Sequence, residues 1–294
     1  EGRDGYASFK QVMKEKNFQL IPHHLIKNGP FPDDIAMLII AGPQRAFAQE
    51  ELTEIQRFLE RGGRLLLLFN YNGVATATGL ENLVKGWGVN VGMNVIDDIQ
   101  RMMATELAIG DFRDHPVSTP LVDAQVGLMM YLPRSIDPLP QQALVQTSDL
   151  VTQGIAFTST NGFTKSDLQS GRLQFSHYRD RKGAIPVLTA VESEASPSVK
   201  TPISGRTRLL VAGDSFFLSN SRLNQYGNRD FASLAAGWLL DQYQLLQGIG
   251  PQPVYEFKLT IPDPEFRQLQ ILMLGILPGA VFAIGMIVWW RRRI

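Results

Sequence analysis

The strongest candidate for a nucleophile is a serine that directly follows an apolar run. Ser215 ends the sequence RLLVAGDS, in which Gly213 and Asp214 come after residues expected to form a buried strand. A serine at such a turn attacks an ester only when an adjacent base takes its proton. The histidines that could serve as this base all precede Ser215 in the chain: His23, His24, His115 and His177. Catalytic triads occur in several chain orders, so a membrane-anchored serine hydrolase stays an alternative hypothesis.

The same turn is similar to the one with which SGNH-type esterases present their serine. Those esterases take the base from an Asp-x-x-His further along the chain, and no histidine follows Ser215 here. The favoured interpretation is structural, with Asp214 and Ser215 hydrogen-bonded to backbone groups in the turn beyond the strand. We therefore predict no catalytic residue and a protein that acts by contact.

Metal and cofactor chemistry finds no better support. His23 and His24 are adjacent, so on a strand they point to opposite faces, and His115 is a lone histidine beside a proline. The absence of cysteine removes thiolate nucleophiles and Cys-rich zinc sites. Neither a GxxxxGK[ST] nor a GxGxxG motif occurs. We predict no metal and no cofactor, and nucleotide hydrolysis, where it occurs, belongs to a partner.

Length and charge limit the remaining classes of protein. The chain has 294 residues, which allows one large domain or two ordinary ones, and its 44% hydrophobic and 19% charged composition indicates a folded body. It carries 28 basic and 28 acidic side chains. This balance provides no general attraction for nucleic acid, so a nucleic-acid partner is not expected.

An uncharged segment near the C-terminal end predicts a membrane-spanning helix. From Ile271 to Trp290 the chain reads ILMLGILPGAVFAIGMIVWW, about the 20 residues that a helix needs to cross the hydrocarbon of a bilayer. The end of the segment is typical of an interfacial aromatic pair followed by a basic anchor, formed by Trp289, Trp290, Arg291, Arg292 and Arg293. By the positive-inside rule the tail is cytoplasmic and everything upstream is extracytoplasmic.

Small residues along this segment favour contact with another membrane helix. Gly275 and Gly279 have GxxxG spacing and Ala283 continues the stripe by one turn. The alternative is that Pro278 kinks the helix and requires small neighbours. At the other end of the chain, Glu1 begins a polar stretch without an apolar signal, so we expect a signal or a first membrane helix to precede it.

In the first hundred residues, segments with the hydrophobic pattern of strands alternate with segments that have the pattern of helices. These elements must position the candidate site residues. Apolar runs joined by amphipathic helices predict a parallel sheet covered on both faces, an α/β fold with a doubly wound sheet of the amidotransferase or flavodoxin type. The expected strands are 18–21, 35–41, 64–69 and 89–95, and the expected helices are 7–16, 49–61 and 79–87.

The rest of the chain divides into an inserted region, a second part of the α/β domain, and a membrane anchor with its stalk. Residues 1–96 form the first part of the α/β domain, and residues 97–205 read as an inserted mixed or β-rich region with strands at 127–132, 143–147, 155–159 and 186–192. Residues 206–250 return to the α/β domain through a strand at 208–212 and a helix at 228–247 that Asn228 is expected to cap. Residues 251–268 are a stalk, and 269–294 are the membrane helix and its arginine tail.

Three passages, in this order along the chain, resemble the GldG-type auxiliary subunits of bacterial ABC-2 transport systems. They are IAMLIIAGPQRAFAQEELTEIQRFLERGGRLLLLFN at Ile35 to Asn70, RLLVAGDSFFLSN at Arg208 to Asn220, and the terminal span that closes on Arg291 to Arg293. A shorter match, DHPVSTPL at Asp114 to Leu121, lies in a middle region that is otherwise dissimilar.

The resemblance implies a non-catalytic accessory subunit that pairs with an ABC permease and an ATPase at the bacterial inner membrane. It also implies an extracytoplasmic domain related in fold to class I glutamine amidotransferases, although the turn that would carry their cysteine reads Asn70, Tyr71, Asn72, Gly73. Doubly wound sheets bind ligands where strands end, so the surface near Gly42, Asn70, Gly213, Asp214 and Ser215 is the candidate site, and an extracytoplasmic ligand-binding sensor is a further alternative.

Overall fold

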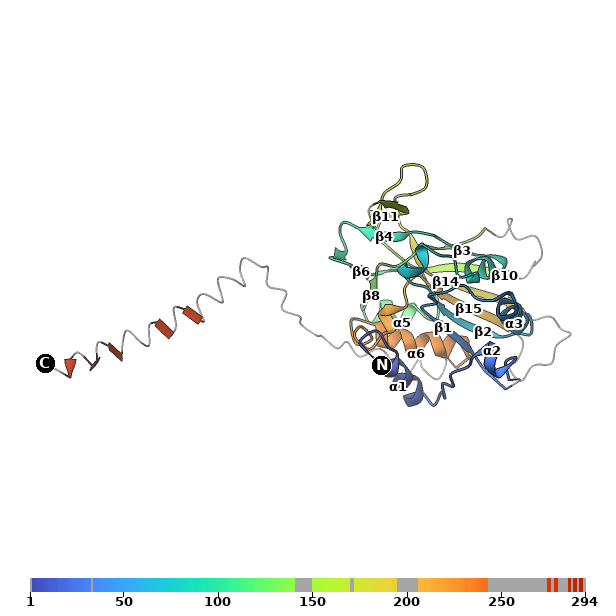
Figure 1. Ribbon diagram of the computed structural model, residues 1–294, viewed down its shortest axis with the longest axis horizontal. Coiled ribbons are helices and arrows are strands. Elements are labelled where there is room, and N and C mark those ends of the chain that lie inside the picture. The colour runs from blue at the N-terminus through green and yellow to red at the C-terminus, as the bar shows by residue number, and fades with distance from the viewer. Residues whose placement is uncertain are drawn as a thin grey trace. The chain divides into compact units, whose positions relative to one another are not determined.

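The computed structural model describes residues 2–32, 34–140, 150–169, 172–194 and 206–242, together with 274–275, 278–279, 285–286, 288–289 and 291–292. The chain divides into two compact units, Glu1–Val254 and Tyr255–Ile294. The first unit carries a mixed α/β fold built on a six-stranded sheet (Figure 1).

The six strands run in the order β1-β2-β15-β14-β10-β7. Strands β1 (Leu38–Ala41), β2 (Arg64–Leu68) and β15 (Arg206–Ala212) pair in parallel. Strands β14 (Pro186–Glu194), β10 (Leu150–Phe157) and β7 (Asp111–Phe112) continue the sheet in antiparallel pairs. The parallel arrangement expected for the strands at 35–41, 64–69 and 208–212 is found, whereas the strand expected at 89–95 is not in this sheet. The antiparallel strands come from the expected insertion, residues 97–205, which joins the main sheet.

Alternate residues of the central strands face two separate hydrophobic cores. Leu66 and Leu68 of β2 pack into the core that contains α1 (Ala7–Glu15) and α6 (Asn228–Leu239). Leu65 and Leu67 pack into the other, with α3 (Gln49–Glu60) and α4 (Leu80–Gly86). These four leucines are 0–1% exposed. A strand covered on both sides must be apolar at every position, which explains the run RLLLL.

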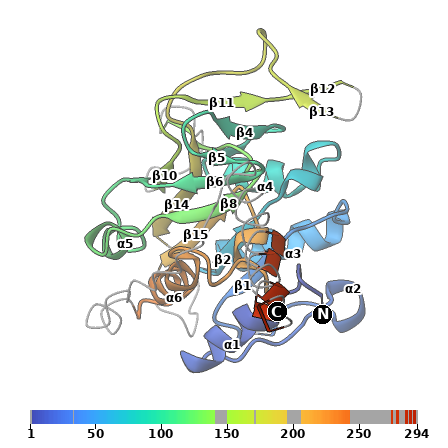
Figure 2. The same ribbon diagram turned by 90° about the vertical axis from the view of Figure 1, so that its left-hand side faces the viewer.

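The other strands form smaller sheets, and those that contain β4, β11, β12 and β13 lie far from α1 and α6 in Figure 2, whereas β8 is hydrogen-bonded to Asn228 of α6. They pair as β4 with β11, β12 with β13, β3 with β9, and β5 with β6 and β8. Their bounds are β3 Val89–Val91, β4 Val95–Asp98, β5 Met102–Met103, β6 Glu106–Ile109, β8 Leu128–Tyr131, β9 Ile136–Pro138, β11 Gly162–Lys165, β12 Asp167–Gln169 and β13 Arg172–Gln174. Two short helices, α2 (Leu25–Asn28) and α5 (Thr119–Asp123), complete the unit.

Several expected elements differ from those observed. Residues 18–21 form no strand, and the expected strand 89–95 is two strands that separate at Gly92. The last helix ends at Leu239, because Asp241 takes a positive φ of 56° that a helix cannot continue. The expected strand 143–147 lies outside the described residues.

The expected stalk and most of the expected membrane helix, Ile271 to Trp290, also lie outside the described residues. Among the residues that are described, no helix combines the length and the apolar character that crossing a bilayer requires. Apart from their own helix backbone and adjacent residues, Gly275 and Gly279 have no described atom within 4 Å of the position that a Cβ would take. Ala283, Trp290 and Arg293 are outside the described part of the chain, and Trp289, Arg291 and Arg292 are within it.

Candidate functional site

The turns that follow the three parallel strands bring Gly42, Asn70 and Ser215 together in a small polar cluster. Gly42 follows β1, Asn70 follows β2, and Ser215 follows β15 by a short turn. The Asn70 Nδ2 lies 3.4 Å from Ser215 Oγ. A Cβ on Gly42 would come within 2.8 Å of that hydroxyl oxygen and 2.9 Å of the Asn70 amide nitrogen. Gly42 has a φ of 63°, so both its backbone and its surroundings require glycine.

One buried atom of this polar cluster, the Asn70 Oδ1, lacks a hydrogen-bond donor among the described residues. Asn70 is 2% exposed and Ser215 is fully buried, and the Asn70 Oδ1 has no hydrogen-bond partner among the described residues. An amide oxygen buried without a donor costs about 1–3 kcal/mol. The strand ends therefore leave an acceptor that a water molecule or a ligand N–H or O–H would satisfy.

Asp214 organises the turn between β15 and Ser215. Its Oδ2 accepts hydrogen bonds from the backbone N–H groups of Tyr131 (2.8 Å) and Phe217 (3.0 Å), and its Oδ1 accepts one from Phe216 (2.8 Å). The carboxylate thus performs the backbone role that its place after a strand predicts. Gly213 lies against Arg134, whose backbone oxygen would be 2.0 Å from an added Cβ.

Burial dominates the electrostatics of the site. It raises the pKa of the Asp214 carboxyl to about 7, against the effect of its three backbone donors and of the Arg222 charge. It also raises the pKa of Tyr6 to about 12, and the Tyr6 hydroxyl donates to the backbone oxygen of Ser215 at 3.2 Å. The Ser215 hydroxyl contacts the Asn70 side-chain amide.

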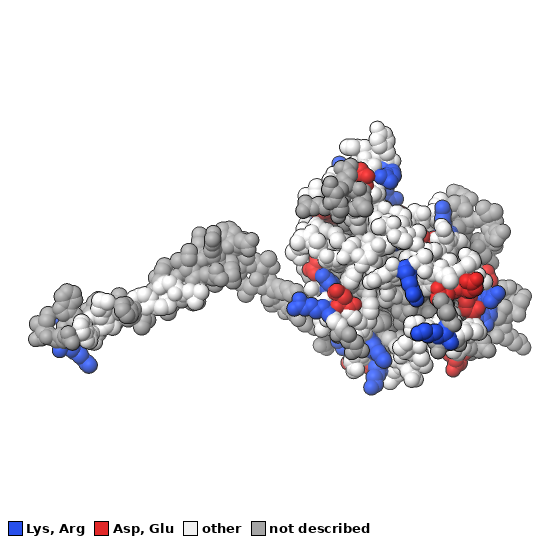
Figure 3. Space-filling view, in the orientation of Figure 1, with Lys and Arg blue, Asp and Glu red and all other residues white. Residues whose placement is uncertain are grey.

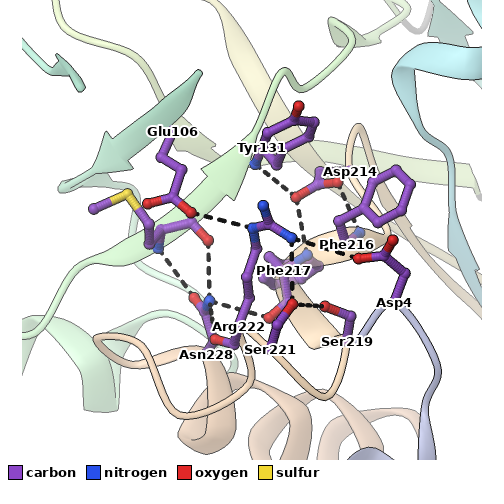
Figure 4. A network of polar contacts seen from close by, with 11 residues as sticks. Asp4, Glu106, Tyr131, Asp214, Phe216, Phe217, Ser219, Ser221, Arg222 and Asn228 are labelled. Carbon is purple, nitrogen blue, oxygen red and sulfur yellow. Dashed lines mark hydrogen bonds and ion pairs between the residues drawn. The ribbon is translucent and has the colours of Figure 1, made fainter. Parts of the chain in front are cut away.

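An aromatic triangle and one arginine adjoin these turns. The rings of Tyr71, Tyr131 and Phe216 lie 5.6–5.9 Å apart by their centroids, and all three are partly exposed. The Arg222 guanidinium lies over the Tyr131 ring at 4.5 Å and pairs with Glu106 at 3.2 Å (Figure 4). Tyr and Arg with rigid neighbours are the side chains most often responsible for binding energy at protein interfaces.

The sequence prediction of the site missed this aromatic and charged part. Tyr71 directly follows Asn70, and Phe216 directly follows Ser215. Their positions next to predicted site residues could therefore have indicated that they belong to the site. Tyr131 comes from β8, and only the tertiary fold brings it to the turn that follows β15.

Asn228 does not have the capping role expected of it. The N-cap position of α6 is Gly227, and Asn228 is fully buried. Its side chain accepts from Met129 N at 3.0 Å and donates to the backbone oxygens of Met129, Phe217 and Arg222 at 2.9–3.1 Å (Figure 4). The capping prediction was wrong because the Asn228 side chain points into the protein. There it bonds backbone groups of three other residues instead of an N–H group at the start of α6.

Three of the histidines have structural contacts away from Ser215. The His115 Nδ1 accepts from Val117 N at 3.2 Å, its ring packs on Trp238, and burial lowers its pKa to about 4. His23 bonds the Gly29 oxygen at 3.0 Å, and His177 packs on Phe175. Within the described part of the chain, no group of three or more His, Asp or Glu side chains has the arrangement of a metal site.

Charge is not concentrated on the face of the first unit that Figure 3 presents. Basic and acidic side chains are interspersed there among uncharged ones. Some ion pairs join surface groups, such as Arg229 with Glu15 and Arg179 with Asp167. A surface of this kind does not gather a polyanion by long-range attraction.

These features define a class: an α/β unit with helices on both faces of a mixed sheet and a polar and aromatic surface where the parallel strands end. A family model described as an ABC-type uncharacterized transport system matches residues 4–235. The chain belongs to this family of auxiliary proteins of ABC-type transport systems.

The likeness to a solved structure concerns the fold. A solved structure titled "mmIFT52 N-terminal domain" superimposes with a TM-score of 0.54, over 80% of this chain and 90% of that one, at 14% sequence identity. At this identity the likeness concerns the fold alone. No curated protein matches the chain.

Proposed function

We propose that this chain is a non-catalytic, membrane-anchored accessory subunit of an ABC-type transport complex, of the GldG type. The observation that carries the proposal is the family match over residues 4–235, which includes every strand of the six-stranded sheet. Helices on both faces of the sheet and three parallel strands support a doubly wound, amidotransferase-like ancestry for this unit.

In this proposal the first unit is extracytoplasmic and the chain is fastened to the bacterial inner membrane by residues 271–290. The uncharged length of that segment and the arginines that follow it support this topology. The partners are an ABC permease, which the helix contacts through Gly275, Gly279 and Ala283, and the ATPase that drives it.

The strand-end surface is the proposed contact for substrate, cell-envelope material or another subunit. Tyr71, Tyr131 and Phe216 give a rigid, partly exposed apolar area, and Arg222 adds a charge held in place by Glu106. Such side chains lose little conformational entropy on binding. The non-catalytic role is supported by the Ser215 hydroxyl, which faces an amide, and by Asp214, whose oxygens are used by the backbone.

Co-expression with the permease and ATPase subunits, followed by purification in mild detergent, tests the proposal. We expect both subunits to be recovered with the full chain. A Gly275→Leu/Gly279→Leu double variant should lose most of the permease, whereas Gly285→Leu, which lies off the stripe, should retain it. Recovery of the chain alone, under conditions in which the permease and ATPase hold together, contradicts the proposed partnership.

A ligand-binding sensor is the second candidate, and one observation favours it. The Asn70 Oδ1 is buried without a donor at the carboxyl ends of parallel strands, where such sheets bind ligands. Native mass spectrometry of the freshly purified chain should then find a bound small molecule in the parent protein. An Asn70→Ala variant that folds normally should lose the bound molecule. A parent protein whose measured mass equals that of the polypeptide alone argues against this candidate.

A further inference from the structure

One segment of the first unit lies at the end opposite α1 and α2, as Figures 1 and 2 show. It comprises residues 162–169 and 172–183, which we call the arm, and it contains β11, β12 and β13. Strand β11 pairs with β4, and β12 pairs with β13. None of these strands belongs to the six-stranded sheet, so the arm is an addition to the main sheet.

A single carboxylate gives the arm a fixed shape. The Asp180 Oδ2 accepts hydrogen bonds from Ser166 N at 2.9 Å and from Ser176 N at 2.7 Å. The Asp180 Oδ1 accepts one from Thr164 Oγ1 at 2.8 Å. These bonds join β11 and the residue after it to the loop that carries Tyr178. A loop held in this way loses little conformational entropy when it contacts a surface.

Two ion pairs of the arm expose the cation more than the carboxylate. The Arg179 side chain is 63% exposed and that of its partner Asp167 is 34% exposed. The Arg181 side chain is 51% exposed and that of its partner Asp137 is 19% exposed. Lys182 is exposed, and no carboxylate among the described residues pairs with it. The arm therefore presents mainly positive groups to the solvent.

Aromatic rings lie among these cations. The Tyr178 side chain, next to Arg179 in the chain, is 99% exposed. The Phe175 ring packs on His177 at 5.3 Å between centroids, and the Lys182 Nζ lies 5.3 Å from the Phe175 centroid. Tyrosine partitions to the interface between lipid and water, and lysine and arginine are attracted to anionic headgroups. The arm combines both kinds of side chain on one exposed loop.

We propose that the arm contacts the anionic headgroups of the bilayer that holds this chain. This inference rests on the membrane anchoring proposed above, through residues 271–290. The 28 residues between Gln242 and Ile271 extend to at most about 90 Å. A folded unit of about 240 residues has a radius of gyration of about 18 Å. The connection is therefore long enough for the arm to reach the bilayer.

The anchor favours a lipid surface over a polyanion in solution. The interspersed charges of the first unit give no long-range attraction for a free polyanion. A surface to which the chain is already fastened is present at a high effective concentration, so even a weak contact is populated. Each lysine or arginine close to an anionic bilayer favours that contact by about fivefold. The few exposed cations of the arm are therefore sufficient for a lipid contact.

The absence of cysteine in the chain permits a single fluorescent probe. The full chain with Tyr178→Cys carries a polarity-sensitive fluorophore and is inserted into nanodiscs of phosphatidylcholine, with or without phosphatidylglycerol. We expect a blue-shifted emission in the anionic discs only, and its loss in about 1 M salt, where the Debye length falls to about 3 Å. Ile21→Cys is the matched control, because it replaces an exposed apolar side chain between α1 and α2. Its emission should be the same in both lipids.

A charge variant of the labelled chain tests the cations. Arg179→Gln/Lys182→Gln should lower the equilibrium constant of the lipid contact, measured from the emission shift, by at least about tenfold. Lys10→Gln/Lys14→Gln removes the same charge from exposed positions of α1 and should leave the shift unchanged. A parent-like circular dichroism spectrum and unfolding midpoint establish that each variant folds.

Two results would overturn the lipid contact while the discs still hold the chain. One is the same Tyr178→Cys emission in both lipids, including the case in which a shift requires the permease and ATPase and the arm binds protein instead. The other is a double arm variant that behaves like its control. A chain that does not co-purify with discs of either composition contradicts the membrane anchoring itself, and the lipid contact with it.

Discussion

Asp214 accepts three backbone N–H bonds at a point from which water is excluded, and burial still raises the pKa of its carboxyl to about 7. The folded chain therefore holds a proton that the unfolded chain releases near pH 3.8. Between these two values the native state binds more protons than the unfolded state. The contribution of Asp214 to stability is consequently complete below about pH 4 and is lost as the pH rises towards about 7.

Replacing this carboxyl by an amide should remove at least one of the three bonds, because only one of its two oxygens remains, and should remove the pH dependence. In Asp214→Asn an NH₂ group faces backbone donors, so we expect a loss of about 1–3 kcal/mol in the free energy of unfolding at pH 7. The parent should lose at most about 1.4 kcal/mol per pH unit between pH 4 and 7 through this group, and the variant should lack that slope. Urea unfolding followed by tryptophan fluorescence measures both; identical slopes would assign the pH dependence elsewhere.

Gly42 is the residue on which the meeting of the three strand ends depends. An alanine there would need a φ of 63° and would place its Cβ 2.8 Å from Ser215 Oγ. We expect Gly42→Ala to destabilise the chain by about 2 kcal/mol and to lower the thermal midpoint. Gly86→Ala is the control, because that helical glycine has open space around it and should gain up to about 1 kcal/mol. Equal midpoints for the two variants would contradict the packing.

At the scale of elements, two arginines fasten the end of α6 to the central strands. Arg64 of β2 is fully buried, donates to Leu239 O, and pairs with Asp241 at 2.7 Å. Arg208 of β15 donates to Trp238 O at 2.6 Å and also pairs with Asp241. Cations at the C-terminal end of a helix satisfy its last carbonyls and oppose its dipole. The two arginines thus attach the last turn of α6 to β2 and β15.

Removing the shared carboxylate should cost far more than removing a surface pair. Asp241→Ala leaves the buried Arg64 guanidinium without a carboxylate, whereas Arg208 keeps Glu192 at 2.7 Å. We expect a loss of about 3 kcal/mol in the free energy of unfolding. Arg229→Ala removes an ion pair to Glu15 whose side chains are both 46% exposed, and it should change stability by no more than about 0.5 kcal/mol. Denaturant titrations compare the two, and similar losses would mean that the two arginines do not hold α6.

At the scale of the whole molecule, the proposed topology places the first unit and the C-terminal arginine tail on opposite sides of a membrane. The cysteine-free chain allows single labels: Tyr178 is 99% exposed in the first unit, and Ile294 ends the arginine tail. On intact cells an impermeant maleimide should label Tyr178→Cys and leave Ile294→Cys unlabelled until the cells are opened. Labelling of Ile294→Cys on intact cells would reverse the topology.

The amino-acid sequence by itself determined the elements whose pattern is local. The run RLLLL of β2, the apolar faces of α3 and α6, and the glycines that end α3 predict structure that was then found. A hydrophobic period is set by which faces of one segment are buried, so it can be detected without knowing the partner. The relation to auxiliary proteins of ABC-type transport systems was also indicated by passages of the sequence, and the family match over residues 4–235 confirms it at that level.

Only the tertiary structure decided which segments lie beside one another. Strands β10 and β14 join the main sheet in antiparallel pairs, although nothing in their own sequences specifies a partner or a direction. Asn70 meets Ser215 across 145 positions, and Asn228 bonds Met129 across 99. Contacts at such separations depend on how all the elements pack together, because no local pattern records the residue at the other end.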